Sequence, residues 1–301
     1  SLRFGLQAQS SSPIVEAILF YGVMDEPLVR RIYPVFAPGT EVQISHTERI
    51  EPGQFAPGTR LRSWWRVKTQ DQASLKTEQK VFEYDDTNRD WRRLQGKQVD
   101  LFWYGRDENR ARELLGAAEA ALQRLGEETG VSISKRIRIY VYNSQRDMQP
   151  ALSTRSEGYD DQVTTLGVAM GEDALLLLGT HRDAESTMAH ELSHIVVGIV
   201  TDNPYTGLPR WLDEGLAMYA EGTLPVGNRR ALDAGIKNDT LLSIRSMTSY
   251  SGLASEVDLF YGQAYSIVDW MLRDMGRDKM QQLLAVFREG VRQEEALQRV
   301  Y

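Results

Sequence analysis

The chain contains no cysteine among its 301 residues, which excludes disulfide bonds and any metal site built from thiolates. It also lacks an apolar run of the roughly 18 residues needed to cross a bilayer; the most hydrophobic stretch, residues 195–200, is far shorter. Positive charge is in deficit, because 35 Lys and Arg face 42 Asp and Glu, for a formal net charge of −7. That deficit argues against nucleic acid and anionic membrane as main partners.

Histidine is scarce too, and two of the four lie in the segment His190-Glu191-Leu192-Ser193-His194, which spells H-E-x-x-H. Residues four apart share a helix face, so both imidazoles can bind one metal ion, with Glu191 one step round the helix. Two nitrogen ligands, a water and a carboxylate that accepts its proton are what a zinc hydrolase needs. The simpler alternative is an exposed helix whose histidines have ordinary partners.

A third ligand is expected on a second helix, predicted for residues 209–222, which begins at Pro209 and ends at Gly222. Glu214 on this helix would complete a site of two histidines and one glutamate and leave the fourth position for water. The alternative is an acidic residue in the first helical turn, favoured there by the helix dipole. The neighbouring H-E-x-x-H motif favours the ligand interpretation.

The pairing of H-E-L-S-H with the later W-L-D-E-G-L-A-M-Y resembles the gluzincin zinc metallopeptidases, in particular the peptidase MA-like family, distant relatives of the zinc aminopeptidases and thermolysin. The resemblance covers roughly residues 98–301. It implies that His190, His194 and Glu214 hold Zn²⁺ and that Glu191 is the general base. It also implies a transition-state tyrosine on a later helix, for which Tyr261, in the stretch 260–268, is the counterpart.

Chemistry independently calls for such a tyrosine. When water attacks a peptide carbonyl, the oxygen becomes negative, and a nearby O–H donor stabilises it. The alternative for Tyr261 is core packing, with its hydroxyl bound to a backbone carbonyl. Tyr265 lies one turn further on the same helix face, so the sequence alone does not separate the two residues.

Two departures from better-known gluzincins bear on function. Met218 stands where thermolysin-like enzymes carry an aspartate that orients a metal-bound histidine, so Glu221 or Asp213 is expected to take that role.

Aminopeptidases carry a glutamate in a Gly-Ala-Met-Glu-Asn stretch that holds the substrate's amine. Here Gly167, Val168, Ala169 and Met170 occupy the comparable place, with Glu172 out of register, which favours an endopeptidase. Residues 167–170 remain a candidate edge strand for pairing with substrate.

The first ninety residues differ from the rest in their pattern of apolar and polar side chains. The chain is long enough for two domains, predicted as 1–90 and 91–301. Four segments alternate apolar and polar side chains, at residues 14–24, 41–49, 60–68 and 76–84. They predict an antiparallel β-sandwich of immunoglobulin or fibronectin type III kind. Trp64 and Trp65 fall on opposite faces of one strand. One is expected in the core, and the other to pack against the second domain or to contact a sugar or partner.

The second domain is predicted as a gluzincin-type α+β domain, which makes the whole chain α+β. A polar connector at residues 85–97 precedes it. Strands are expected at residues 99–104, 136–142 and 175–178, and helices at 107–129, around the H-E-x-x-H motif and at 258–274.

The sequence therefore predicts zinc-dependent hydrolysis of peptide or protein substrates. The alternative is a non-catalytic extracellular binding or adhesion protein with a structural or relic metal site, against which the intact Glu191 argues. The first residue is Ser rather than Met, and the absence of cysteine fits an oxidising compartment. We expect an extracytoplasmic or secreted protein with its leader removed, and a membrane anchor in a longer gene product stays open.

Overall fold

The structure is a computed structural model that describes residues 1–24, 26–51, 54–55, 57–130, 133, 135–152, 166–170, 173–202, 207–250 and 252–301. Contacts within the chain group it into two compact units. The first comprises Ser1–Arg89 and Arg146–Val163, and the second comprises Asp90–Gln145 and Thr164–Tyr301.

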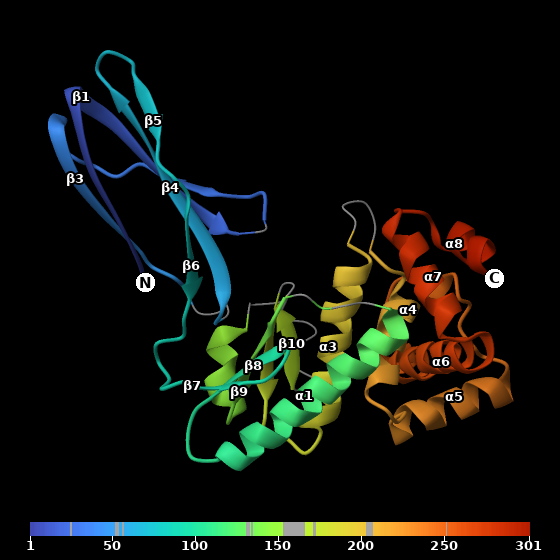
Figure 1. Ribbon diagram of the computed structural model, residues 1–301. Coiled ribbons are helices and arrows are strands. Elements are labelled where there is room, and N and C mark those ends of the chain that lie inside the picture. The colour runs from blue at the N-terminus through green and yellow to red at the C-terminus, as the bar shows by residue number, and fades with distance from the viewer. Residues whose placement is uncertain are drawn as a thin grey trace. The chain divides into compact units, whose positions relative to one another are not determined.

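The first unit is built on one antiparallel sheet of six strands (Figure 1). The long first strand pairs with three others, and β4 pairs in addition with β5 and β6. The strands are β1 (Leu2–Val23), β2 (Arg30–Ile32), β3 (Gly39–Glu48), β4 (Thr59–Thr69), β5 (Ser74–Lys76) and β6 (Lys80–Tyr84).

Strand β1 bends back over itself near its middle. The rings of Phe4 and Tyr21 lie at its two ends, yet their centroids are only 5.3 Å apart. A straight strand would separate them by about 55 Å, at roughly 3.3 Å per residue. The register of β1 shifts between Gln9 and Ile14, where pairing with β3 gives way to pairing with β4. The sheet therefore closes over a small apolar core between the two halves of β1.

The two adjacent tryptophans of β4 serve different faces of this sheet. Trp65 is buried in the core between the layers, as predicted for one of the pair. Trp64 points to the other face, where its ring stacks on Phe20 at 5.3 Å with an interplanar angle of 3°. Arg62 and Lys76 lie against the Trp64 ring at 5.8 and 4.8 Å from its centroid. The face opposite the core is thus an aromatic pair set among cations.

The second unit begins with a five-stranded sheet in the order β10-β11-β9-β8-β7. Its three inner strands run parallel, and both edge strands are antiparallel to their neighbours. The elements are β7 (Arg92–Gln95), β8 (Val99–Trp103), α1 (Glu108–Thr129), β9 (Ile137–Tyr142), β10 (Gly167–Met170), β11 (Ala174–Leu178) and α3 (Ala184–Val200). A short helix α2 (Gln145–Met148) and a 3₁₀ turn η1 (Gln149–Ala151) follow β9 in the sequence.

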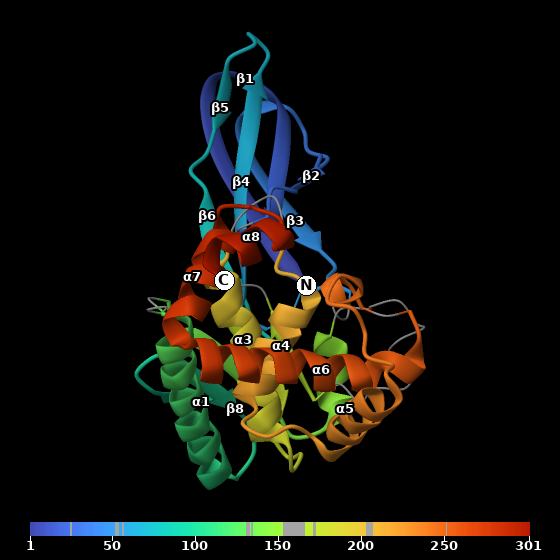
Figure 2. The ribbon, with the colours of Figure 1, turned by 90° about the vertical axis from the view of Figure 1, so that its right-hand side faces the viewer.

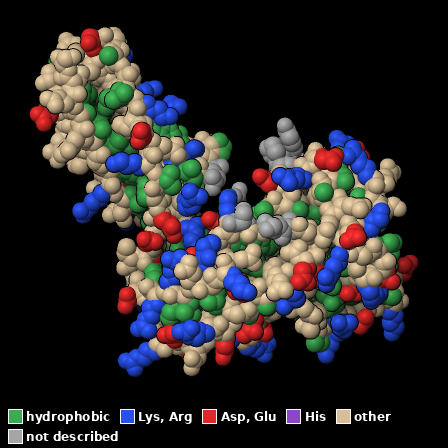
Figure 3. Space-filling view, viewed as in Figure 1, with side chains coloured by type: hydrophobic (Ala, Val, Ile, Leu, Met, Phe, Trp, Pro, Cys, Tyr) green, Lys and Arg blue, Asp and Glu red, His purple; other side chains and the backbone are tan. Residues whose placement is uncertain are grey.

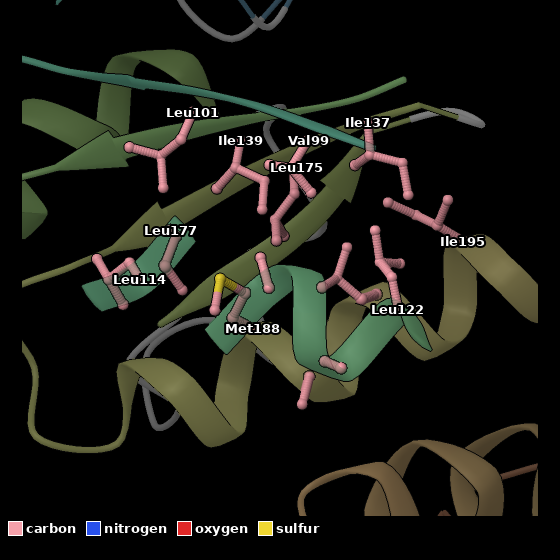
Figure 4. Packing of buried hydrophobic residues seen from close by; sticks show 14 of the residues in the cluster. Val99, Leu101, Leu114, Leu122, Ile137, Ile139, Leu175, Leu177, Met188 and Ile195 are labelled. Atoms are coloured by element: carbon pink, nitrogen blue, oxygen red, sulfur yellow. The ribbon is translucent and has the colours of Figure 1, made fainter. Parts of the chain in front are cut away.

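Helices α1 and α3 pack on each other and on the inner strands of this sheet. Helix α1 begins at Asp107, whose carboxylate accepts a hydrogen bond from the backbone N–H of Arg110, and ends at Gly130 in the left-handed conformation. The core between helices and strands holds a large cluster of buried apolar side chains (Figure 4). Its members include Leu101, Leu114, Leu122, Ile137, Ile139, Leu175, Leu177, Met188 and Ile195. This packing fixes α3, and with it the H-E-x-x-H motif, against the sheet.

The rest of the second unit is helical and has its own apolar core, in which α4 packs on α6 (Figure 2). The helices are α4 (Arg210–Ala220), α5 (Val226–Asn238), α6 (Val257–Trp270), α7 (Arg277–Arg288) and α8 (Gln293–Val300). Short 3₁₀ turns η2 (Ser246–Thr248) and η3 (Ala254–Glu256) precede α6, and a π-helical turn η4 (Met271–Met275) follows it. Figure 3 shows Lys and Arg interspersed with Asp and Glu over the visible face of this unit.

The predicted α+β class is confirmed, and the strands and helices lie close to their expected bounds. Two expectations were wrong. Residues 2–13 belong to a strand that the sequence analysis began at residue 14, and residues 92–95 form edge strand β7 instead of part of a connector. Strand β7 is short and largely exposed, which leaves little apolar alternation to detect. In β1, by contrast, Leu2, Phe4, Leu6 and Ala8 do alternate with polar residues or glycine, and this signal was missed. The described strands of the first unit form one continuous sheet, whereas an immunoglobulin sandwich has two. Among the described residues, no helix has the length and hydropathy of a membrane span.

Candidate metal centre

Helix α3 presents the two histidines of the motif on its side away from the sheet core. Met188, Leu192 and Ile195 face the core and are almost fully buried. His190 and His194 lie one turn apart, with ring centroids 5.0 Å from each other at 76°. The apolar face thus sets the direction in which the imidazoles point.

Helix α4 supplies the carboxylate that meets them. It begins after Pro209, and Glu214 is only 3% exposed. The next residue, Gly215, permits a close crossing with α6, since a Cβ there would lie 2.6 Å from the backbone oxygen of Ala264. A larger residue would push α4 away from α6 and displace Glu214.

The ligand atoms of His190, His194 and Glu214 all lie within 4.8 Å of one another. The Oε2 atom of Glu214 is 3.5 Å from His190 Nε2 and 3.8 Å from His194 Nε2. Two ligand atoms of a tetrahedral zinc ion, each bound at about 2.1 Å, lie roughly 3.4 Å apart. Two imidazole nitrogens and one carboxylate oxygen at this spacing fit a zinc ion with an open position.

The other nitrogen of each imidazole is held by its own carboxylate. Glu221 Oε1 lies 2.7 Å from His190 Nδ1, and Asp213 Oδ1 lies 3.0 Å from His194 Nδ1. Asp213 also accepts a hydrogen bond of 3.2 Å from Arg210. The sequence left open which of the two carboxylates orients a histidine. The structure uses both, one for each ring, and this directs each Nε2 toward Glu214.

The centre stabilises positive charge. Burial by itself would lower the pKa of His190, but hydrogen bonds with Glu214 and Glu221 outweigh it and raise the pKa to about 10. Burial would also lower the pKa of His194, but Asp213 outweighs it and raises that pKa overall. Burial acts to raise the pKa of Glu214, yet His190, His194 and Tyr250 lower it overall. The surroundings therefore keep this carboxylate ionised and favour a cation at the point where the three residues meet.

Glu191 lies between the two histidines in sequence but has different surroundings. Burial raises the pKa of its carboxyl, against the opposing effect of His190 and His194. Its Oε2 accepts a hydrogen bond of 3.1 Å from the backbone N–H of Ala169 on β10. A carboxylate with a raised pKa, held at the edge of a candidate metal centre, is suited to exchange protons with water.

Strand β10 consists of residues 167–170, the four that the sequence indicated, and among the described strands it lies at the edge of the sheet. It runs beside α3, with Gly167 so close that a Cβ would lie 2.8 Å from Thr187 Cγ2 and 3.1 Å from Glu191 Cγ. The neighbouring Glu172 lies outside the described residues.

A tyrosine other than the expected one contacts the carboxylate ligand. Tyr261 is half-buried on α6, and its ring packs edge-on against Phe260 at 5.5 Å. Tyr250, which the sequence analysis missed, donates a hydrogen bond from its hydroxyl to Glu214 Oε1. Its pKa is raised by burial, by Glu214 and by the nearby Tyr261. Tyr250 lies in an irregular segment between η2 and η3, and no motif or periodicity there marks it.

Tyr265, the alternative to Tyr261, packs instead toward the C-terminal end of α4, with its ring centroid 6.2 Å from that of Tyr219. Its pKa is raised by burial and by Asp269. The two tyrosines of α6 therefore have different neighbours, although their spacing along the helix is a single turn.

Comparison with known proteins agrees with the resemblance seen in the motifs. The sequence model of the Peptidase MA superfamily matches residues 117–301, more than half of the chain. No curated protein matched in the corresponding search. Among solved structures, the M1 zinc metallopeptidase from Deinococcus radiodurans is 13% identical over 98% of this chain and 84% of that one. Its TM-score of 0.39 is too low for that likeness to carry weight, and the family match alone decides: the chain belongs to the Peptidase MA superfamily.

Proposed function

We propose that this protein is a zinc metallopeptidase that hydrolyses peptide bonds with water. Membership of the Peptidase MA superfamily supports peptidase chemistry in general. The observation that carries the proposal is the convergence of His190, His194 and Glu214, whose ligand atoms lie within 4.8 Å of one another. A structural site has no need of the adjacent base, and Glu191 is present beside this one.

In this proposal His190 and His194 bind zinc through Nε2 and Glu214 binds it through a carboxylate oxygen. A bound zinc ion lowers the pKa of a coordinated water to about 7 and polarises a carbonyl oxygen. Glu221 and Asp213 hold the rings with Nε2 directed at the metal position, supported by the hydrogen bonds at 2.7 and 3.0 Å. This arrangement keeps both imidazoles in the tautomer that a metal ligand requires.

Glu191 acts as the general base. It accepts a proton from the attacking water and then delivers that proton to the nitrogen of the departing amine. Burial raises the pKa of its carboxyl, which makes the protonated form accessible during turnover. The hydrogen bond from the N–H of Ala169 to Oε2 fixes one carboxylate oxygen and leaves the other for the water.

Tyr261 donates its hydroxyl proton in a hydrogen bond to the carbonyl oxygen as negative charge develops there. Its place on α6, close enough to Tyr250 to affect the pKa of that residue, supports this role. Tyr250 donates to Glu214 and so positions the carboxylate ligand. Of the two tyrosines on α6, Tyr265 is assigned no part in the reaction, because it packs toward Tyr219.

The substrate binds in an extended form along β10, through backbone groups of Gly167, Val168, Ala169 and Met170. An edge strand offers unpaired N–H and C=O groups for such pairing, and in β10 the N–H of Ala169 is excepted because it already donates to Glu191. We further propose that residues 91–301 hold the enzyme and that residues 1–90 form a sandwich-like accessory domain. The location is extracytoplasmic, and the substrates are peptides or proteins cleaved within the chain.

The test compares the wild-type protein with Glu191→Gln and with Glu185→Gln, a matched control in the exposed first turn of α3. We expect about one zinc ion per chain in all three and loss of peptide hydrolysis by at least about a hundredfold in Glu191→Gln only. Equal activity in wild type and Glu191→Gln would end the proposal. Zinc binding by a wild-type protein that cleaves no member of a peptide library would favour a binding or adhesion protein instead.

A further inference from the structure

A cavity of about 320 Å³ opens between α1, the end of α4 and the second half of α6. All of its lining belongs to the second unit. The polar and aromatic side chains around it are Arg124 and Glu128 from α1, Tyr219 from α4, and Tyr265 and Asp269 from α6. Its size is at the lower end of the range for small-molecule sites, which runs from about 300 to 1,000 Å³.

Glu128 is the unusual member of this lining. It is 8% exposed, and its carboxylate makes no hydrogen bond or ion pair with any residue that the structure describes. Arg277 on α7 pairs with Glu127 at 3.7 Å. Burial raises the pKa of the Glu128 carboxyl, although Arg277 and Arg124 act on it from a distance. Its oxygens are not among the fully buried atoms that lack a hydrogen-bond partner, so they reach the space of the cavity, where a donor or a cation can meet them.

The remaining lining also favours a cation with an apolar body. Asp269 adds a second carboxylate, whose negative charge helps to raise the pKa of both Tyr219 and Tyr265. The rings of Tyr219 and Tyr265 lie 6.2 Å apart at a tilt of 32° and form a continuous aromatic surface. Aromatic rings attract ammonium groups as well as methylene groups. Arg124 is exposed and lies one turn before Glu128, so it leaves the buried end of the cavity acidic.

We propose that this cavity binds an alkylammonium group, with the charged nitrogen at Glu128 and the carbon chain against Tyr219 and Tyr265. Two sources share this chemistry, namely a free aliphatic amine and the lysine side chain of a peptide. An anion is disfavoured because two carboxylates line the cavity, and a neutral alcohol leaves the buried charge unmatched.

The location gives this site a connection to the metal centre. Ala220 and Gly222 line the cavity on either side of Glu221 in the sequence, and Glu221 holds His190. Binding of the ammonium does not depend on the proposed function, since none of the residues that would contact it is a proposed metal ligand or general base. A failed peptidase assay therefore leaves this inference intact.

The experiment is calorimetric titration at about pH 8, where an alkylamine is still protonated and a carboxyl ionises. The probes are n-butylammonium, its neutral counterpart butanol, the anion butyrate, and Nα-acetyl-lysine amide. The variants are Glu128→Gln and, as the matched control, Glu108→Gln, a half-exposed glutamate at the opposite end of α1.

We expect saturable binding of n-butylammonium with a Kd on the order of 1 mM. Glu128→Gln should weaken it at least about tenfold, or ~1.4 kcal/mol, while Glu108→Gln stays within about twofold. If the lysine amide also binds, the source is a peptide side chain. If n-butylammonium binds and the lysine amide does not, the source is a free amine. A second variant, Asp269→Asn, should weaken binding less, because the carboxylate of Asp269 already forms an ion pair with Arg273 at 3.4 Å.

Equal binding by wild type and Glu128→Gln would overturn the inference, as would equal affinity for butanol or a preference for butyrate. Absence of any saturable binding by the wild type would show that water alone satisfies Glu128. Near-ultraviolet circular dichroism checks that Glu128→Gln is folded, which is expected because glutamine matches the shape of glutamate and removes a buried charge.

Discussion

Glu221 Oε1 lies 2.7 Å from Nδ1 of His190, across the gap between the end of α4 and the middle of α3. The same helix that supplies Glu214 therefore also aims one of the two imidazoles at it. Asp213 does the same for His194 at 3.0 Å, so a single helix positions three carboxylates around the two histidines of the other. Helices α3 and α4 together therefore form the candidate metal centre.

Loss of this orienting contact should weaken metal binding without removing a ligand. Glu221→Gln is expected to lower zinc affinity about tenfold to a hundredfold, because the His190 ring loses a charged acceptor at Nδ1. Competition with a chromogenic chelator measures this. The control is Glu113→Gln, an exposed residue on α1 whose zinc affinity should equal that of the wild type. An unchanged affinity in Glu221→Gln would show that the contact does not orient the ligand.

Substitutions of the two tyrosines of α6 should differ in their effect on the kinetics of hydrolysis. Tyr261→Phe is expected to lower kcat about a hundredfold with KM nearly unchanged, because only the transition state carries the negative oxygen. Tyr265→Phe should stay within about threefold, since its ring packs toward Tyr219. Steady-state kinetics on a peptide that the wild type cleaves decide the matter. The reverse pattern would transfer the role to Tyr265.

A methyl group at residue 167 should disturb the general base. In Gly167→Ala the new Cβ would lie 2.8 Å from Thr187 Cγ2 and 3.1 Å from Glu191 Cγ, so β10 or Glu191 must shift. We expect hydrolysis to slow by about tenfold or more at unchanged zinc content. Adding Thr187→Ser removes the nearer methyl group and should restore part of the rate. Gly198→Ala on α3, which meets nothing within 4 Å, is the control. Full activity in Gly167→Ala would contradict the tight placement of β10.

Glu128 should make stability depend on pH in a defined direction. Burial raises its folded-state pKa above the usual 4.5, so the folded chain binds this proton more tightly than the unfolded chain. Its contribution is fully favourable below about pH 4.5 and is lost as the pH rises through the folded-state pKa. Glu128→Gln should therefore gain stability over the wild type with rising pH, by on the order of 1 kcal/mol at neutral pH. Urea unfolding at matched zinc content measures the difference, and a gain that shrinks with pH would refute it.

Much of the second unit was predictable because its signals are local. The spacing of His190 and His194 requires only a helix, and Pro209 and Gly222 bracket the helix that carries Glu214. Strand β11 is a continuous apolar run, which is typical of a buried parallel strand. Family membership was likewise predictable, since the two motifs that carry it are short and contiguous.

What escaped prediction depends on contacts between distant segments. Tyr250 meets Glu214 from an irregular segment 36 residues later, and nothing in its own surroundings marks it. The bend of β1 brings Phe4 against Tyr21, although the sequence there reads as a polar stretch around Ser10. Glu128 looks like one more charge on a charged helix, and only the packing of α4 and α6 shows that it is buried.

The central claim is that His190, His194 and Glu214 bind one zinc ion and leave it an open position. X-ray absorption at the zinc edge of the purified protein tests it most directly, with His190→Ala and Glu214→Ala as comparisons. We predict two imidazole nitrogens at about 2.0–2.1 Å and a carboxylate oxygen at about 2.0–2.2 Å in the wild type, and loss of stoichiometric zinc in both variants. A zinc shell without imidazole, or full zinc content in either variant, would contradict the account.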